Sequence, residues 1–315
     1  MRWYWIVLLV LPPLVGPVLL PPFGQRLVTL VGIYALMGVG YQRVFGQLGG
    51  LNLAQGALFG VGAYAVALTA PALGSLAFVV AALAAIVVAA IVAVPILRLQ
   101  SHYFALATLA LASLVNLVAV HAESITGGAN GIVGFSALLP RGTALLAGVW
   151  ICLIAVVLVQ AYFFAGRRDE AARLIREAPL VAATLGIDVQ RWRFAGFVLG
   201  GAAAGLAGGA AAAVSGVVSP DVTGFPIMLL CLTSVVLGGA RHPMGAVLGA
   251  AIAVCLPELF RDLNGAWLLA YALATLAVVL FAPQGIAGLI DPAPAPLPPQ
   301  MPVRLMPSTS GRPSS

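Results

Sequence analysis

Ten of the 24 charged residues of this 315-residue chain lie in one segment, 166–193, which is therefore the densest place for ionic chemistry. The segment is GRRDEAARLIREAPLVAATLGIDVQRWR, and it is the one long charged stretch between apolar segments. Glu170 lies three residues before Arg173, and Arg173 lies four before Glu177, so these side chains can form ion pairs on a helix surface. We interpret the segment as an element that docks an aqueous partner. The alternative is a solvated amphipathic loop that lies on the membrane surface.

Helical signals recur within this charged segment. Apolar side chains from Ala172 to Ala182 return at spacings of three and four, as on one face of a helix. Pro179 interrupts that helix or starts a second one, because it lacks an amide donor. Leu185 to Asp188 reads as a C-terminal turn in which Gly186 is free to adopt a positive φ.

A catalytic or metal-binding cluster is not recognisable in the sequence. His102, His121 and His242 lie far apart, and nothing completes a triad around His121 and the nearby Glu123. The chain has no lysine, which excludes ATP hydrolysis through a lysine-containing phosphate loop and excludes Schiff-base chemistry. The three cysteines sit singly in apolar runs, as small buried residues do. We therefore expect no enzyme activity, no metal and no cofactor in this chain.

The elements that must position the charged segment are membrane helices. The composition is 62% hydrophobic and 8% charged, with a mean hydropathy of +1.09. A span needs about 20 apolar residues, and within lipid such runs become helices. We predict an all-α, polytopic transmembrane helical bundle of about eight to ten spans, some of them short or broken. The candidate spans are 3–21, 27–45, 54–70, 76–97, 103–120, 143–165, 194–214, 225–240, 244–258 and 266–282. The third, eighth and ninth are short and glycine-rich.

The arginines predict an orientation for this bundle. If the N-terminus is cytoplasmic and the spans alternate, twelve arginines fall inside and three, namely Arg26, Arg141 and Arg261, fall outside. The N-terminal run carries three prolines and an aromatic cluster, so we interpret it as a retained first span rather than a signal peptide. Residues 1–290 form the predicted transmembrane domain, with 166–193 cytoplasmic. Residues 291–315 are proline-rich and predict a disordered cytoplasmic tail.

Polar and glycine-rich positions outside the charged segment suggest a transport path or gate. Asn52 and Gln55 adjoin a glycine-rich break, where amides either face a cavity or bond between helices. Further polar residues lie along 103–133, where a glycine-rich loop suits a gate, a substrate contact or an ordinary turn. The candidate path residues are Asn52, Gln55, Gly56, Tyr64, Tyr103, Thr108, Ser113, Asn116, Thr126, Gly127, Gly128, Asn130 and Gly131.

Several motifs together resemble a known family. LNLAQGALFGVGAY (51–64), YFALATLAL (103–111), SITGGANGI (124–132), the charged segment, SPDVTGF (219–225) and LGGARHPMGAVLGA (237–250) occur in order. The chain resembles LivM-type permeases of high-affinity branched-chain amino-acid ABC importers, from about residue 27 to 290. Similar permeases handle urea, short amides or other amino acids, which is the alternative cargo.

The resemblance implies a coupling role for the charged segment and a set of partners. The implied coupling residues are Gly166, Arg167, Arg173, Arg176, Glu177, Leu185, Gly186 and Ile187. The implied partners are a second LivH-like permease, two cytoplasmic ATPase subunits that bind the ATP, a periplasmic substrate-binding protein and the lipid bilayer of the bacterial inner membrane, with no nucleic acid. ATP binding would then drive alternating access as a rigid-body motion.

Departures from the family pattern affect substrate choice and coupling. Ser113 and Asn116 stand where an acidic and a basic residue are usual, and Pro179 stands where proline is unusual. Two rival functions remain: an ion-coupled secondary transporter, which would need intramembrane carboxylates, and an intramembrane enzyme, which would need a catalytic cluster. The acids outside the charged segment sit at predicted loops or span ends, which argues against the first rival.

Overall fold

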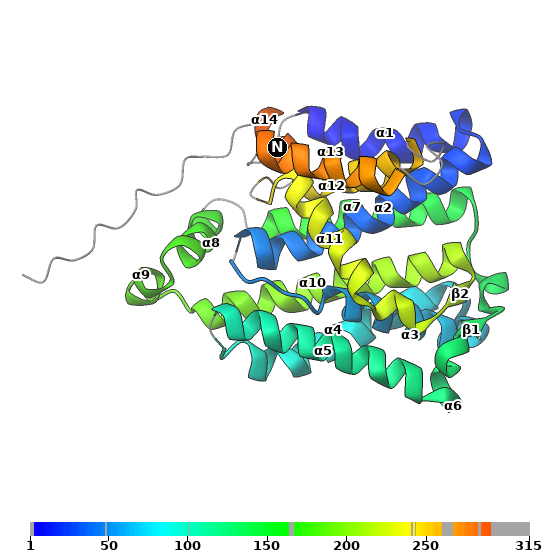
Figure 1. Ribbon diagram of the computed structural model, residues 1–315, viewed down its shortest axis with the longest axis horizontal. Coiled ribbons are helices and arrows are strands. Elements are labelled where there is room, and N and C mark those ends of the chain that lie inside the picture. The colour runs from blue at the N-terminus through cyan, green and yellow to red at the C-terminus, as the bar shows by residue number, and fades with distance from the viewer. Residues whose placement is uncertain are drawn as a thin grey trace, which may run out of the picture.

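The computed structural model consists almost entirely of helices (Figure 1). It describes residues 3–47, 49–99, 101–163, 167–240, 242, 244–259, 267–282 and 285–290. The long helices are α1 (Trp3–Leu19), α2 (Pro22–Gln42), α3 (Gln55–Leu73), α4 (Ala77–Ile96), α5 (Ser101–His121), α7 (Thr143–Phe163) and α10 (Val189–Ser215). Shorter helices are α6 (Glu123–Thr126), α8 (Arg167–Glu177), α9 (Pro179–Thr184), α11 (Phe225–Gly238), α12 (Gly245–Leu259), α13 (Trp267–Phe281) and α14 (Gly285–Ile290). The predicted all-α helical bundle is confirmed. The predicted tail, 291–315, lies outside the described residues.

Helix α10 lies at the centre of the bundle and packs against α2, α3 and α4. Glycines allow this close approach, because a Cβ on Gly62 would collide with the Gly205 backbone and a Cβ on Gly208 with the Phe59 carbonyl. The glycine run of α10 that ends at Gly209 therefore lies in close contact with its neighbouring helices. On its other side, α2 packs against α7, α11 and α12.

The lengths of the helices agree with a membrane protein. Within the described part of the chain, five helical stretches are long and apolar enough to cross a bilayer. The longest, Gln55–Ile96, is the α3–α4 hairpin that turns at Gly74. The prediction of a short third span was wrong, since α3 has 19 residues, whereas α11 and α12 are short, at 14 and 15 residues. Arg26, which we had placed in a loop, lies inside α2 because Pro22 starts that helix earlier. The count of eight to ten spans stays a prediction.

The two ends of the bundle are built differently (Figure 1). At one end, α2 continues into a π-helical turn, η1 (Arg43–Gln47), and α8 and α9 project beyond the long helices. At the opposite end, β1 (Ile132–Val133) pairs antiparallel with β2 (Val217–Val218). Three short 3-10 turns also lie at that end: η2 (Gly74–Leu76), η3 (Gly128–Asn130) and η4 (Phe135–Leu138). A further one, η5 (Pro220–Thr223), follows β2 and starts the connection to α11.

Candidate functional site

The charged segment folds into two helices, α8 and α9, joined at a sharp bend. Ala178 has a φ of −147° and ψ of 69°, so it leaves the helical region, and Pro179 occupies the first turn of α9. Of the two possibilities that the sequence left open, Pro179 therefore starts a second helix. Gly186 has a φ of +80°, as predicted for the turn that follows. Asp188 then caps α10, accepting a hydrogen bond from the Arg191 amide at 3.0 Å.

The α8–α9 hairpin has a small apolar core of its own. Ala172, Ile175 and Ala182 are buried, and Trp192 and Leu199 of α10 pack against them. This cluster is separate from the main core of the bundle. Ile187, a predicted coupling residue, is half-buried against the same cluster. The hairpin is therefore held to the first turns of α10 by apolar contact and is positioned to move with that helix.

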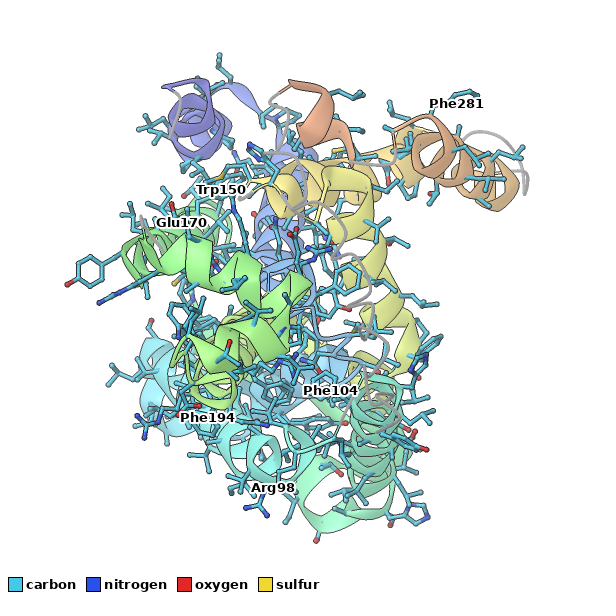
Figure 2. All side chains as sticks on the ribbon, turned by 90° about the vertical axis from the view of Figure 1, so that its left-hand side faces the viewer. Arg98, Phe104, Trp150, Glu170, Phe194 and Phe281 are labelled. Atoms are coloured by element: carbon cyan, nitrogen blue, oxygen red, sulfur yellow. The ribbon has the colours of Figure 1, made fainter. Side chains whose placement is uncertain are left out.

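The outer surface of the hairpin combines charge with exposed apolar side chains. Arg173, Glu177 and Gly186 are exposed, and the side chains of Leu180 and Leu185 are 82% and 68% exposed. Figure 2 looks onto this end of the molecule. Large apolar side chains on a projecting polar element are typical of a protein contact. Of the other predicted coupling residues, Arg167 begins α8, and Gly166 lies outside the described residues.

Arg176 faces the bundle rather than the outer surface. Its guanidinium donates a hydrogen bond to the carbonyl of Gly46, within the π-helical turn η1. The side-chain stem also lies close to Gly49, which has a φ of +72°. A charged donor makes a stronger hydrogen bond than a neutral one. The hairpin is thus connected to the end of α2 as well as to α10.

The end of α2 is a polar junction that the sequence analysis missed. Arg43 is only 6% exposed, and its Nε donates to Gln160 Oε1 of α7 at 3.0 Å. Gln42 donates from its side-chain amide to backbone carbonyls of the α11–α12 connection, including that of His242, and accepts from the Ala246 amide at 3.3 Å. The available signal was the pair Gln42 and Arg43 at the end of one span and Gln160 near the end of another.

The polar side chains beside the glycine-rich break form hydrogen bonds between neighbouring helices. Asn52, Gln55 and Thr108 are all fully buried. Gln55 donates to the Gly200 carbonyl of α10 at 3.0 Å, and Thr108 accepts from the Leu53 amide at 3.0 Å. These contacts agree with the helix-to-helix alternative that the sequence left open. A role for the three residues in the transport path stays a prediction.

Other predicted path residues surround a cavity of about 240 Å³ between α3, α5 and α11. Gly56, Ser113, Asn116 and Thr223 line it, with no charged side chain among the lining residues. Asn116 donates to the Pro220 carbonyl at 2.9 Å and to the Thr223 hydroxyl at 2.8 Å, which joins α5 to η5.

Two predicted path residues, both tyrosines, lie away from this cavity lining. Tyr64 is buried, and its hydroxyl has no partner within the part of the chain that the structure describes. Tyr103 is 69% exposed near the start of α5. The structure therefore brings only Gly56, Ser113 and Asn116 of the predicted set together around one space.

The glycine-rich loop at the other end is folded tightly rather than open. The Thr126 hydroxyl donates to the Ala119 carbonyl at 2.7 Å and accepts from the Gly128 amide at 3.2 Å. Gly127, Gly128 and Gly131 all have positive φ, and a Cβ on Gly131 would collide with the Val218 carbonyl. Asn130 is exposed at the tip. The loop is thereby fixed to β2, and its role as a gate stays a prediction.

Comparisons with known proteins agree with the membrane bundle. The family model described as branched-chain amino acid transport system / permease component matches residues 25–282. The permease LivM of Salmonella typhimurium is 28% identical over 298 residues, covering 84% of this chain and 70% of the relative. The permease LivH of Escherichia coli is 30% identical over 288 residues, covering 83% and 93%. BraD of Pseudomonas aeruginosa is 26% identical over 288 residues, covering 82% and 93%.

No solved structure matches the chain. The family model nevertheless covers the helices from α2 to α13, including the projecting hairpin and the polar junction beneath it. Together with helices long enough to cross a bilayer, this identifies a multi-pass membrane protein. The chain belongs to the family of branched-chain amino acid transport permeases.

Proposed function

We propose that the chain is the membrane-spanning subunit of an ABC importer and moves branched-chain or related hydrophobic amino acids by alternating access. The relatives named above are permeases of high-affinity branched-chain amino acid transport systems, which supports this cargo. The observation that carries the proposal is the α8–α9 hairpin, which projects from the bundle with exposed Leu180 and Leu185 and remains tied to two long helices.

The hairpin would transmit the motion that ATP binding and hydrolysis cause in the ATPase to the helices of the transport path. In the proposed mechanism, an ATPase subunit contacts the outer surface around Arg173, Glu177 and Leu180. Its motion passes to α10 through the apolar cluster around Ile175, and to α2 through the hydrogen bond from Arg176 to Gly46. Packed helices transmit such a displacement as rigid bodies because their interiors are close-packed. The chain itself would bind no ATP and catalyse no reaction, since it lacks the lysine of a phosphate loop.

The proposed assembly contains two ATPase subunits, a second LivH-like permease and a periplasmic binding protein, all within or against the lipid bilayer. Helix α5 supports a second membrane subunit, because Leu106, Leu114 and Leu117 are more than half exposed beside the polar cavity that Ser113 and Asn116 line. Polar side chains within a membrane normally face other protein or a water-filled space and not lipid, so this face of α5 suits a contact with a second subunit. No nucleic acid is part of the proposal.

The distribution of arginines supports a cytoplasmic position for the hairpin in the bacterial inner membrane. Arg43 lies in η1, at the end of the bundle that carries α8 and α9, and Arg98 lies between Leu97 and Leu99, which line a cavity together with Arg176 of α8. Arg26 and Arg141 line a shared cavity at the opposite end, beside Gly216. Cytoplasmic loops carry the excess of positive charge, so we propose that the α8–α9 end, the N-terminus and the C-terminal tail are cytoplasmic.

The test is reconstitution into lipid vesicles with the candidate ATPases, the second permease and the binding protein. ATP-dependent accumulation of radiolabelled leucine, isoleucine or valine, lost when the ATPases are omitted, is the expected result. Urea and acetamide form the alternative arm, which the uncharged lining around Ser113 and Asn116 would also admit. Uptake driven by a proton or sodium gradient without ATPases would overturn the proposal.

A further inference from the structure

A second cavity, of about 410 Å³, lies beneath the hairpin at the ends of α4 and α5. Its polar lining comes from Arg176, Arg193 and His102, and no acidic side chain lines it. The remaining lining includes apolar side chains of the bundle, among them Leu97 and Phe104, which are both only 6% exposed. In Figure 2, which looks onto this end, Phe104 lies among the helices and away from the outer edge of the molecule. The two arginines of the lining come from α8 and α10, whereas Leu97 and Phe104 come from the end of α4 and the start of α5.

Arg193, which lines this cavity, has one buried hydrogen-bond donor, its Nε, without an acceptor among the described residues. A buried charged donor without a partner costs free energy, so the native environment normally supplies one. Arg191, two residues earlier on α10, behaves differently: it pairs with Asp188 at 2.8 Å, and its side chain is 88% exposed. Two arginines of one helix turn thus differ: Arg191 is exposed and paired, whereas Arg193 is half-buried and its Nε has no partner among the described residues.

We propose that this cavity binds the phosphate headgroup of an anionic phospholipid, with the start of an acyl chain against the apolar wall. The guanidinium of Arg193, with Arg176 held beside it by Gly46, would meet the phosphate oxygens. Leu97 and Phe104 would contact the glycerol backbone and acyl carbons. Basic pockets between membrane helices on the cytoplasmic side are suited to such headgroups.

A lipid fits this cavity better than a soluble anion does. Helices α4 and α5 end and begin here, and Leu99 and Tyr103 next to it are exposed, so the cavity opens at the depth where apolar spans meet water. Inorganic phosphate or an acidic side chain of a partner would satisfy Arg193 but would leave the apolar wall without contact. The bound lipid would join the hairpin to α4 and α5, because Arg176 and Phe104 line the same cavity.

Lipid binding to the purified full-length chain tests the proposal without any ATPase or cargo. Native mass spectrometry would compare short-chain phosphatidylglycerol, short-chain phosphatidylcholine and inorganic phosphate. We expect phosphatidylglycerol to bind about tenfold more tightly than phosphatidylcholine, and Arg193→Gln to remove that preference. Arg191→Gln is the matched control and should keep it, because that side chain lies in solvent.

A second variant covers the case in which Arg193→Gln does not fold. Ala105 lines the cavity and is half-buried, so Ala105→Phe would fill the space while both arginines remain. We expect this variant to lose phosphatidylglycerol binding at least tenfold. The proposal is overturned if the two phospholipids bind equally, if Arg191→Gln weakens binding as much as Arg193→Gln, or if inorganic phosphate competes as well as the short-chain lipid does. Because no transport is measured, failure here would leave the proposed importer function standing.

Discussion

The two ends of the bundle differ in how firmly their connecting segments are attached to the long helices. At the α8–α9 end, a charged hairpin keeps a small core of its own and touches the bundle at few places, chiefly through Arg176 and the Ile175 cluster. At the other end, the loop after α5 is fixed by the β1–β2 pair and by Gly131, which has no room for a side chain against Val218. In the hairpin, the positive-φ glycine Gly186 has open space around it, whereas Gly131 at the second end is closely packed.

This difference indicates which end is built to transmit motion. A hairpin that is held mainly to α10 and to the end of α2 can pass a displacement to those two helices, because it makes few contacts elsewhere. A loop that is fixed by backbone hydrogen bonds and by closely packed glycines can move only together with the helices that it joins. Paired substitutions, one at each end, test whether the two ends differ in this way.

The largest effect is expected from Gly131→Val. The residue has a φ of +70°, and a Cβ there would collide with the Val218 carbonyl, so strain and overpacking add to about 2–4 kcal/mol of lost stability. Thermal unfolding of the purified chain measures it. The control is Gly134→Val, where φ is +85° but nothing lies within 4 Å of the added Cβ. Equal losses in the two variants would show that packing at Gly131 contributes nothing.

A smaller and local effect is expected from Arg176→Ala. Removing a charge-assisted hydrogen bond to the Gly46 carbonyl should weaken the attachment of the hairpin by about 1.5–3 kcal/mol. Hydrogen exchange followed by mass spectrometry should then quicken in α8 and α9 and stay unchanged in the α3–α10 core. Arg173→Ala, on the exposed side of the same helix, is the control. Faster exchange throughout the bundle would contradict a separately attached hairpin.

Gly186→Val should cost about 1–2 kcal/mol through backbone strain alone, since its φ is +80° and the space around it is open. Because the strain falls in the turn that aims α9, we expect ATP-driven uptake to be lost while membrane insertion is retained. Gly142→Val has the same kind of strain at the other end, with a φ of +55° and open space, and should keep uptake. Normal uptake by the Gly186 variant would remove the turn from the coupling account.

The smallest effect is expected from Asn116→Ala, which loses two hydrogen bonds that join α5 to η5. A net cost of about 1 kcal/mol follows for neutral bonds of this kind. Ser113→Ala is the matched control, because the Ser113 hydroxyl bonds only the Leu109 carbonyl of its own helix. If the midpoints of thermal unfolding for the two variants coincide, Asn116 does not brace the helices.

The sequence predicted the features that depend on local periodicity and backbone chemistry. The helices, the break at Pro179 and the positive φ of Gly186 all follow from residues near one another in the chain. Arg43 shows where this reasoning ends. A single arginine after an apolar run was assigned to the cytoplasmic side, whereas a π-helical turn carries it against Gln160, which is 117 residues away.

In the candidate site, the type of each residue could be predicted from its neighbours in the sequence, but its bonding partner, which lies far away in the chain, could not. Asn52 and Gln55 were recognised as buried amides, but their partner, the carbonyl of Gly200, depends on how closely α3 and α10 pack. The loop of Thr126 to Gly131 was recognised as turn-forming, but its pairing partner β2 lies more than 80 residues further on. Arg176 was assigned to the docking surface, and only the packing of α8 against η1 turns it inward.

The central claim is that the α8–α9 hairpin is the contact for a cytoplasmic ATPase. Its most direct test is a pull-down of the tagged chain from its own membranes in mild detergent, followed by mass spectrometry. The account predicts that an ATPase and a second permease are recovered with the unmodified chain and with Leu138→Asp, an exposed leucine at the opposite end. Leu180→Asp should reduce recovery of the ATPase at least tenfold while the second permease remains. Equal recovery of the ATPase by all three chains would contradict the claim.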